Sequence, residues 1–316
     1  MIQGHQHATR ERHLQWGAQA LWRQLEPLLP GLSVEVVERS ASTNSELLER
    51  ARIVPPGHSG RVGDAGDPSA RIGRRQADTQ PCLLVAEHQM AGRGRMGRSW
   101  RSTRGASLTF SLALPMAPRD WSGLSLAVGV ALVEALQANG DASPWRLGLK
   151  WPNDLWLLPT SAVDGSAARQ GRKLGGVLIE TLAAGSQRLA VIGIGLNISP
   201  LAEVPVSPEA PAALACLREL DPGATAPGTL SRIALPLVQA LKAFEHEGFA
   251  AFANRFAAVD LLRDEAIVTS EPGLPQGVAR GVNGQGGLRV ETPAGLQIVS
   301  SGEVSVRPAA CALPAA

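Results

Sequence analysis

The sequence predicts an α+β fold in two parts: a domain of strands and helices that ends near residue 258, and a β-barrel of roughly 50 residues after it. The 316 residues are 44% hydrophobic and 18% charged, which is enough apolar material for a large buried core. Before residue 258, segments with helical spacing of apolar residues occur among apolar runs typical of strands. After residue 266, several short β-type runs are separated by glycine-rich turns.

The first part begins with a helix, a strand and a second helix. Residues 13–30 carry apolar side chains at helical spacing, and residues 32–37 alternate as in a strand. The Ser/Thr/Asn cluster at 40–45 is a typical helix N-cap, so a helix is expected to follow it. Residues 52–80 hold five glycines and three prolines without periodicity, and we expect a surface insertion there.

The remaining elements follow from the same patterns. Further strands are expected at 81–87, 107–114, 147–150, 155–158, 173–182 and 188–198, and helices at 124–139, near 209–220 and at 230–256. A second polar insertion is expected at 159–171. The runs that predict the barrel are 266–270, 277–282, 288–291, 297–300 and 304–306. The chain is thus expected to divide into an N-terminal helical extension (1–32), a main domain (33–258), the barrel (262–310) and a tail (311–316).

Composition argues against several classes of protein. The net charge of +2 does not by itself indicate a partner that is a polyanion. No apolar run approaches the roughly 20 residues of a membrane helix, and the polar first residues lack the apolar stretch of a signal peptide. Cys82, Cys216 and Cys311 are far apart and outside any CxxC pattern, which argues against a disulfide scaffold or a zinc site. We therefore expect a cytoplasmic protein without a membrane partner.

Lysine is rare in this sequence. Of the 30 basic residues, 27 are arginine, and the lysines are Lys150, Lys173 and Lys242. Codon bias explains the overall skew, but each exception raises the question whether the position needs a compact primary ammonium. Lys242 falls in an amphipathic segment and is expected on its solvated face, whereas the other two lie in segments that carry chemical signals.

Residues 92–100 (Gly-Arg-Gly-Arg-Met-Gly-Arg-Ser-Trp) carry the densest of these signals. The glycines match the GxGxxG pattern literally, but residues 88–91 separate them from the preceding strand and no apolar helix follows, so a dinucleotide-binding turn is rejected. Glycines let the backbone wrap a ligand, and Arg93, Arg95 and Arg98 offer permanently charged donors to phosphate or carboxylate oxygens. We expect this loop to order when it binds an anion; the alternative is a solvated basic loop or an RNA-binding stretch.

Two further segments place a lysine in an unusual setting. In residues 150–154 (Lys-Trp-Pro-Asn-Asp), Asn153 and Asp154 follow a strand end and suit Mg²⁺ held to a nucleotide, although a plain turn is the simpler interpretation of that segment alone. Lys173 enters an apolar strand just before a Gly-Gly pair. An ammonium there is costly unless it meets an anion or reaches water from the strand end.

Together these segments resemble the bacterial biotin protein ligases, in that family's order, from about residue 33 to 308. The matching pieces are 42–44 (Ser-Thr-Asn), 86–95 (Ala-Glu-His-Gln-Met-Ala-Gly-Arg-Gly-Arg), 150–155 (Lys-Trp-Pro-Asn-Asp-Leu), 173–180 (Lys-Leu-Gly-Gly-Val-Leu-Ile-Glu), 193–197 (Gly-Ile-Gly-Leu-Asn) and 302–307 (Gly-Glu-Val-Ser-Val-Arg). The resemblance implies a mixed β-sheet catalytic domain with helices, followed by an SH3-like barrel. It also implies that biotin is activated with ATP to biotinyl-5′-adenylate and then transferred to a lysine of a biotin carboxyl carrier domain.

The resemblance implies a role for each matching residue. Lys173, Arg93 and Arg95 are implied as the catalytic cations, which offset the repulsion between a carboxylate and a triphosphate. The residues implied to bind biotin are Ser42, Thr43, Asn44, Gln89, Gly92, Arg93, Gly94, Arg95, Lys173 and Gly176. The residues implied to bind ATP are Arg95, Arg98, Trp100, Lys150, Asn153, Asp154, Asn197 and Arg307, and Asp154 would also meet Mg²⁺ through the nucleotide.

The sequence also departs from the family in three respects, one of which is the pair of unusual insertions at 52–80 and 159–171. Met96 stands where the family's loop often has arginine. Members that repress transcription carry a winged helix of about 60 residues before the Ser-Thr-Asn segment, where this sequence has about 40, so we expect no DNA binding.

The expected partners include a second copy of this chain in a homodimer. The alternatives to a biotin ligase are a lipoate or octanoate ligase or transferase of the same fold and, disfavoured by the near-neutral charge, a nucleic-acid-binding module.

Overall fold

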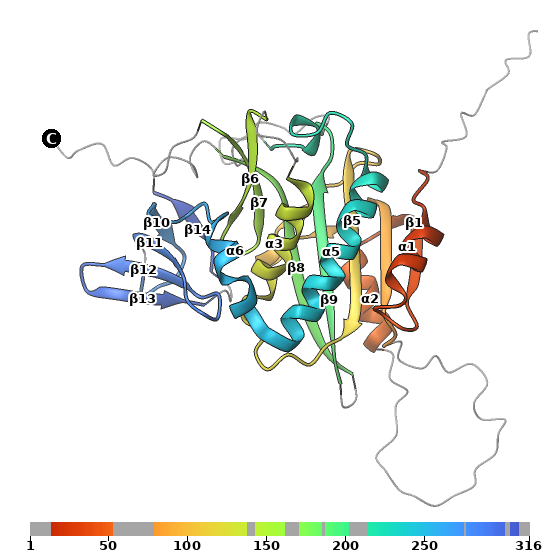
Figure 1. Cartoon of the computed structure of the whole chain (residues 1–316), viewed down its shortest axis with the longest axis horizontal. Coiled ribbons are helices and arrows are strands. Elements are labelled where there is room, and N and C mark those ends of the chain that lie inside the picture. The colour runs from red at the N-terminus through yellow and green to blue at the C-terminus, as the bar shows by residue number, and fades with distance from the viewer. Residues whose placement is uncertain are drawn as a thin grey trace, which may run out of the picture.

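Seven strands form the central sheet of the computed structural model (Figure 1). In spatial order they are β1 (Ser33–Ser40), β2 (Cys82–Gln89), β5 (Ser107–Pro115), β9 (Gln187–Asn197), β8 (Arg172–Ala184), β7 (Asp154–Pro159) and β6 (Trp145–Lys150). β1 and β2 are parallel and the other neighbours are antiparallel, so the sheet is mixed, as expected. The structure describes residues 14–52, 79–137, 143–161, 171–184, 187–201, 214–274, 276–300 and 304–309.

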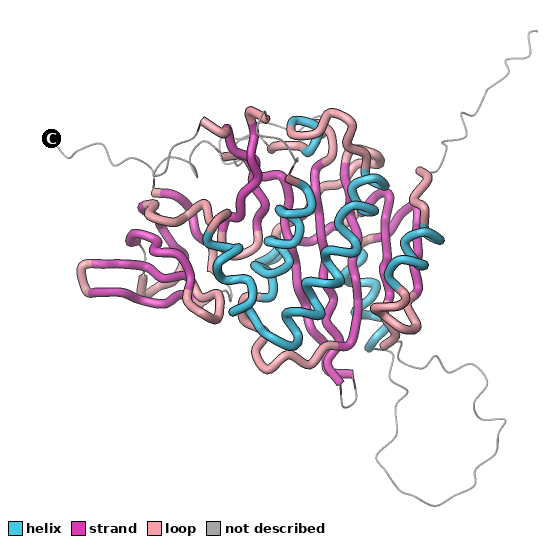
Figure 2. The backbone as a smooth tube through the Cα atoms, in the orientation of Figure 1, coloured by secondary structure: helices cyan, strands magenta, loops and turns pink. Residues whose placement is uncertain are grey.

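Helices cover the two faces of this sheet differently (Figures 1 and 2). The helices α1 (Ala18–Leu25), α3 (Leu124–Leu136) and α5 (Ala226–Glu247) pack on one face, where large side chains such as Phe110 and Ile194 join the main core. The helix α2 (Thr43–Arg52) packs on the opposite face and buries Leu84 and Val191. Because side chains alternate along a strand, the intervening positions Ser111 and Gly193 also lie on the α2 face. Beyond α2 the side chains on that face are small or polar, and the candidate site lies there.

The carboxy-terminal part is a five-stranded antiparallel sheet, consistent with the expected SH3-like barrel. Its strands are β10 (Ala266–Thr269), β11 (Gln276–Val282), β12 (Leu288–Thr292), β13 (Gly295–Val299) and β14 (Val306–Pro308). The barrel contacts the main domain near the β6–β7 turn, where the Trp151 indole donates a hydrogen bond of 3.0 Å to the carbonyl of Gly286. This contact holds the barrel close to the segment that carries Asn153 and Asp154.

Two expected helices differ from those observed. The helix expected at 13–30 is confined to α1, because Pro27 has no backbone N–H with which to continue the helical hydrogen bonds after Glu26. The helix expected at 230–256 begins earlier, because the Thr225 side chain accepts a hydrogen bond from Gly228 N and acts as an N-cap. It ends at Glu247, because Gly248 has φ 67° and a 3₁₀ turn (Gly248–Phe252) and α6 (Ala253–Ala257) follow.

Other expectations fall partly outside the described residues. Near 209–220 the described part, from residue 214, holds only a 3₁₀ turn, Leu217–Glu219. The expected insertions at 52–80 and 159–171 and the tail at 311–316 lie largely or wholly outside it. Within the described residues, no helix is both long enough and apolar enough to cross a membrane.

Candidate active site

The glycine-arginine loop folds into a small hairpin against the α2 face of the sheet. Its strands β3 (Gly92–Arg93) and β4 (Ser99–Trp100) pair antiparallel, and a 3₁₀ turn (Arg95–Gly97) joins them. Gly92 is required here because a Cβ would lie 2.5 Å from the Trp100 carbonyl oxygen. A Cβ on Gly195 would likewise lie 2.5 Å from Trp100 Cε2, so glycine leaves room for the indole on the sheet. The loop and the sheet are therefore fitted to each other.

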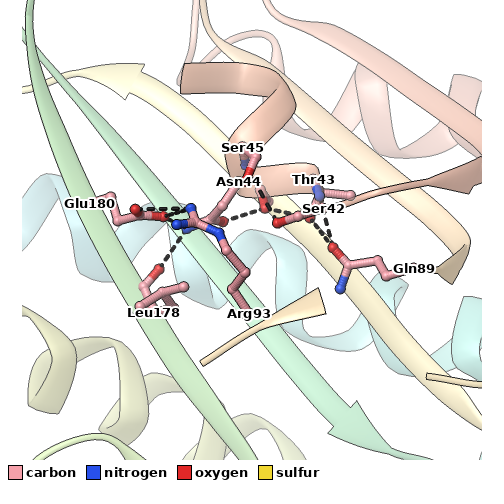
Figure 3. A network of polar contacts seen from close by, with 9 residues as sticks. Ser42, Thr43, Asn44, Ser45, Gln89, Arg93, Leu178 and Glu180 are labelled. Atoms are coloured by element: carbon pink, nitrogen blue, oxygen red, sulfur yellow. Dashed lines mark hydrogen bonds and ion pairs between the residues drawn. The ribbon is translucent and has the colours of Figure 1, made fainter. Parts of the chain in front are cut away.

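A hydrogen-bond network joins the start of α2 to β2 and β5 (Figure 3). The backbone N–H of Thr43 donates to Gln89 Oε1 over 2.7 Å, and the Thr43 hydroxyl lies 3.1 Å from the same oxygen. The Thr43 and Ser111 hydroxyls are 2.6 Å apart, and Ser111 donates to Asn44 Oδ1 over 2.5 Å. All four side chains are buried. Such a network fixes the direction of each donor and acceptor and suits a neutral polar ligand group.

A carboxylate from β8 completes this network. The Asn44 amide donates to Glu180 Oε2 over 2.9 Å and to the Leu178 carbonyl over 3.2 Å. Arg93 Nη2 lies 2.9 and 2.7 Å from the two Glu180 oxygens (Figure 3). The segments at 42–44, 86–95 and 173–180, which are far apart in sequence, therefore meet at one place.

A second cluster is cationic and lies further along the same face. Lys173 Nζ is 2.7 Å from Asp154 Oδ1, and a Cβ on Gly176 would be 3.2 Å from that oxygen. Lys173 Nζ is also 6.0 Å from the centre of the Trp100 ring, which links this cluster to the loop. The two clusters together place a set of fixed polar groups beside a set of cations.

Lys150 is the most buried cation of the second cluster. Its side chain is 9% exposed, and within the described residues its only specific partner is the Trp156 ring, whose centre is 5.5 Å from Nζ. Burial lowers the pKa of Lys150 to about 8, the negative charge of Asp154 opposes this shift, and neighbouring cations such as Lys173 reinforce it. The buried ammonium is therefore suited to meeting an anion.

Arg95 lies between the loop, the β6–β7 turn and the barrel. Its guanidinium is 3.5 Å from Asn153 Oδ1 and 3.5 Å from the Val304 carbonyl. Burial lowers the pKa of Arg95 from its usual value. A cavity of about 300 Å³ lies beside it, but its lining includes the first residues of α3 and Ile179, which belong to the α3 side of the sheet and not to the α2 face. Arg95 thus connects the loop, the β6–β7 turn and the barrel at the edge of the site.

The other residues singled out in the sequence occupy different settings. The Ser42 hydroxyl accepts the Ser45 N–H over 3.4 Å at the start of α2. Asn197 donates to the Ala215 carbonyl over 3.0 Å and is buried. Arg98 and Arg307 are exposed and contribute to the positive surroundings of Lys150. Of these four, Ser42 and Asn197 thus have a structural contact that the sequence does not indicate.

Two residues of the hydrogen-bond network, Ser111 and Glu180, were not assigned from the sequence. Ser111 alternates with large apolar residues of its strand, and its place on the other face was the available signal. Glu180 ends the quoted segment 173–180, but its partners come from distant segments. The contacts of these two residues cannot be predicted from the local sequence, because their partners lie in distant segments.

The described residues around the β6–β7 turn offer few oxygen donors for a metal ion. Among the described residues, no three His, Cys, Asp or Glu side chains cluster closely enough to hold a metal. Asp154 offers one carboxylate and Asn153 one amide oxygen at the same turn. Mg²⁺ that keeps waters and phosphate oxygens needs few protein ligands of this kind.

The fold and these clusters place the chain in a class of ligases. The model of the Biotin/lipoate A/B protein ligase family matches residues 73–197, and that of the Biotin protein ligase C terminal domain matches residues 272–307. The Biotin--[acetyl-CoA-carboxylase] ligase of Mycobacterium tuberculosis is 31% identical over 91% of this chain and 91% of its own length. The Bifunctional ligase/repressor BirA of Escherichia coli is 30% identical over 91% of this chain and 78% of its own.

A solved structure agrees with these relatives. The biotin protein ligase from Aquifex aeolicus in complex with biotin and ATP is 25% identical, has a TM-score of 0.61, and matches 89% of this chain and 100% of its own. This chain belongs to the biotin protein ligase family.

Proposed function

We propose that this protein activates biotin with ATP to biotinyl-5′-adenylate and transfers biotin to a lysine of a biotin carboxyl carrier domain. The observation that carries the proposal is the juxtaposition of two clusters on one face of the sheet. The neutral network around Asn44 and Gln89 suits the ureido group of biotin, and the cations Lys173 and Lys150 suit a carboxylate beside a triphosphate. Trp100 and the glycines of β8 and β9 lie between them.

The proposed chemistry, which the family implies, consists of two displacements. A carboxylate oxygen of biotin attacks the α-phosphorus of ATP, the bond to the bridging oxygen breaks, and pyrophosphate leaves. The neutral amine of the acceptor lysine then attacks the acyl carbon, AMP leaves with the bonding electron pair, and the amine loses a proton. Both steps build negative charge on oxygens, which Lys173 and Arg95 are placed to stabilise. Neither step needs a covalent intermediate with the protein.

The remaining site assignments are part of the same proposal. Thr43, Asn44, Gln89, Gly92 and Gly176 would line the biotin subsite, and Lys150, Asn153 and Trp100 the nucleotide subsite. Asp154 and Asn153 would hold Mg²⁺ together with the phosphates, and the metal would supply charge neutralisation there. We keep Ser42, Gly94, Arg98, Asn197 and Arg307 as candidates.

Partners, location and organisation are also proposed. The protein partner would be the carrier domain of a biotin-dependent carboxylase, in the cytoplasm. We propose the domain limits 33–258 and 262–310. A homodimer is tested by sedimentation, and the expected lack of operator binding is tested by gel retardation with biotin present.

The test of the proposed function is a reconstitution. The full chain is mixed with ATP, Mg²⁺, biotin and a purified biotin carrier domain, and the carrier is analysed by intact mass spectrometry. We expect the mass shift of one biotin that depends on ATP. A shift only with lipoate or octanoate would establish the alternative ligase of the same fold, and no shift with any of the three acids would refute both.

A further inference from the structure

Glu180 has two partners that belong to different functional segments. Its carboxylate accepts a hydrogen bond from the Asn44 amide over 2.9 Å and contacts Arg93 Nη2 over 2.9 and 2.7 Å. We infer that Glu180 is a positioning residue for biotin, which fixes the Asn44 amide and anchors the glycine-arginine loop through Arg93. This inference rests on the proposed function and assigns a role within it.

The orientation of the Asn44 amide depends on this carboxylate. Asn44 Nδ2 donates to two acceptors, Glu180 Oε2 and the Leu178 carbonyl, and Asn44 Oδ1 accepts from Ser111. A flipped amide would point its oxygen at two acceptors and its NH₂ group at the hydroxyl that now donates to it. Glu180 therefore sets which end of Asn44 is a donor, and through Ser111 it sets the hydroxyl chain that reaches Thr43.

The anchoring of the loop depends on the same group. Arg93 lies in β3, paired with Ser99, so a guanidinium held on the sheet also holds the strand that carries Gly92. A Cβ on Gly92 would lie 3.2 Å from Gln89 Nε2, which shows how closely this strand approaches the network. The ion pair with Glu180 gives Arg93 an anchoring role in this inference, beside its proposed role as a cation of the site.

Two substitutions separate the partners of Glu180. Glu180→Gln keeps an oxygen that can accept from Asn44 but removes the charge that holds Arg93. Glu180→Ala removes both interactions. Glu134→Gln is the matched control, because Glu134 contacts Arg255 with both oxygens on partly exposed side chains, away from this site. Arg93→Gln, alone and combined with Glu180→Gln, closes a double-mutant cycle.

The measurements are the Kd of biotin by calorimetry, the kcat of adenylate formation at saturating biotin, and the circular dichroism of each variant. We expect Glu180→Gln to raise the Kd about tenfold and Glu180→Ala about 50-fold, with kcat within about twofold of the parent. Glu134→Gln should leave both constants unchanged. In the Arg93→Gln background, Glu180→Gln should have almost no further effect on the Kd.

The outcomes distinguish this inference from the function on which it rests. A parent protein that neither binds biotin nor forms adenylate would overturn both. A parent that does so, with an unchanged Kd in a folded Glu180→Gln variant, would overturn the positioning role alone. Full additivity in the cycle, or a fall in kcat without a change in Kd, would also overturn it, because Glu180 would then act independently of Arg93 or in the chemical step.

Discussion

Lys173 and Asp154 form an ion pair of 2.7 Å between neighbouring strands. The β7–β8 ladder contains a register irregularity, which places Asp154 opposite Gly176 and Lys173 opposite Trp156. Without a side chain on Gly176, the ammonium reaches across to the carboxylate. The ion pair therefore holds the ammonium beside the β6–β7 turn, and in the proposed reaction a cation fixed in this way reduces the reorganisation that is needed.

We expect Lys173→Arg to slow adenylate formation by about 100-fold or more while the protein stays folded. The guanidinium is larger and planar, and it does not reproduce a compact ammonium in this space. Pyrophosphate release with biotin and ATP measures the rate, and circular dichroism checks the fold. Lys242→Arg, at the lysine of α5, is the control and should be unaffected. Equal rates for Lys173→Arg and the parent would contradict the role of this lysine.

We expect kcat/KM for ATP to depend on pH because of Lys150. Its pKa is lowered to about 8 by burial, so the charge is present below pH 8 and is lost as the pH rises above it. We expect kcat/KM for ATP to fall towards a tenfold loss per pH unit above pH 8, because the free protein then lacks the cation. Lys150→Arg should keep its charge and show a flatter profile up to pH 9.5. Parallel profiles for the two proteins would contradict this explanation.

A substitution of Gly193 tests how tightly the network around Asn44 is packed. A Cβ at this position would overlap Asn44 Oδ1, and the opposite side of the strand is filled by core. We expect Gly193→Ala to raise the KM for biotin about tenfold or more, because Asn44 must leave its hydrogen bonds. Gly284→Ala is the control, since nothing lies within 4 Å of a Cβ there. An unchanged KM in Gly193→Ala would show that Asn44 does not contact biotin.

Asp260 lies in the connection to the barrel, and we expect it to make the free energy of unfolding depend on pH. Its Oδ1 accepts the Leu262 N–H over 3.0 Å, but Oδ2 is buried without a hydrogen-bond partner in the described structure. Burial raises the pKa of Asp260 to about 6, above the unfolded value of 3.8. The folded state therefore binds the proton more tightly, and the free energy of unfolding falls as the pH rises from about 4 to 6.

Asp260→Asn tests this effect. We expect the variant to be more stable than the parent by about 1–3 kcal/mol at pH 7.5 and to lose that advantage at pH 4. Urea denaturation at the two pH values measures the difference. A variant that is less stable than the parent at pH 7.5 would mean that the carboxylate is satisfied in solution.

Local sequence was sufficient for most of the fold. The strands and helices were placed by the period of their apolar residues, which reports the face that each element buries. The misplaced start of α5 shows the limit: the Thr225 cap and the nearby proline were local signals that the apolar pattern alone does not include. The gaps in apolar pattern at 52–80 and 159–171 coincide with residues outside the described parts of the structure.

The chemical character of the candidate site could also be predicted from the sequence, since Gly-Arg-Gly-Arg, Trp-Pro-Asn-Asp and the rare lysines are local patterns. Which side chains meet was decided only by the tertiary structure. Asn44 and Glu180 are 136 residues apart, and Arg93 and Glu180 are 87 apart. Their contact depends on the register of β5, β9 and β8 and on the position of α2 across them. Strand register is a property of the whole sheet, and a shift of one residue would turn Glu180 and Ser111 to the opposite face.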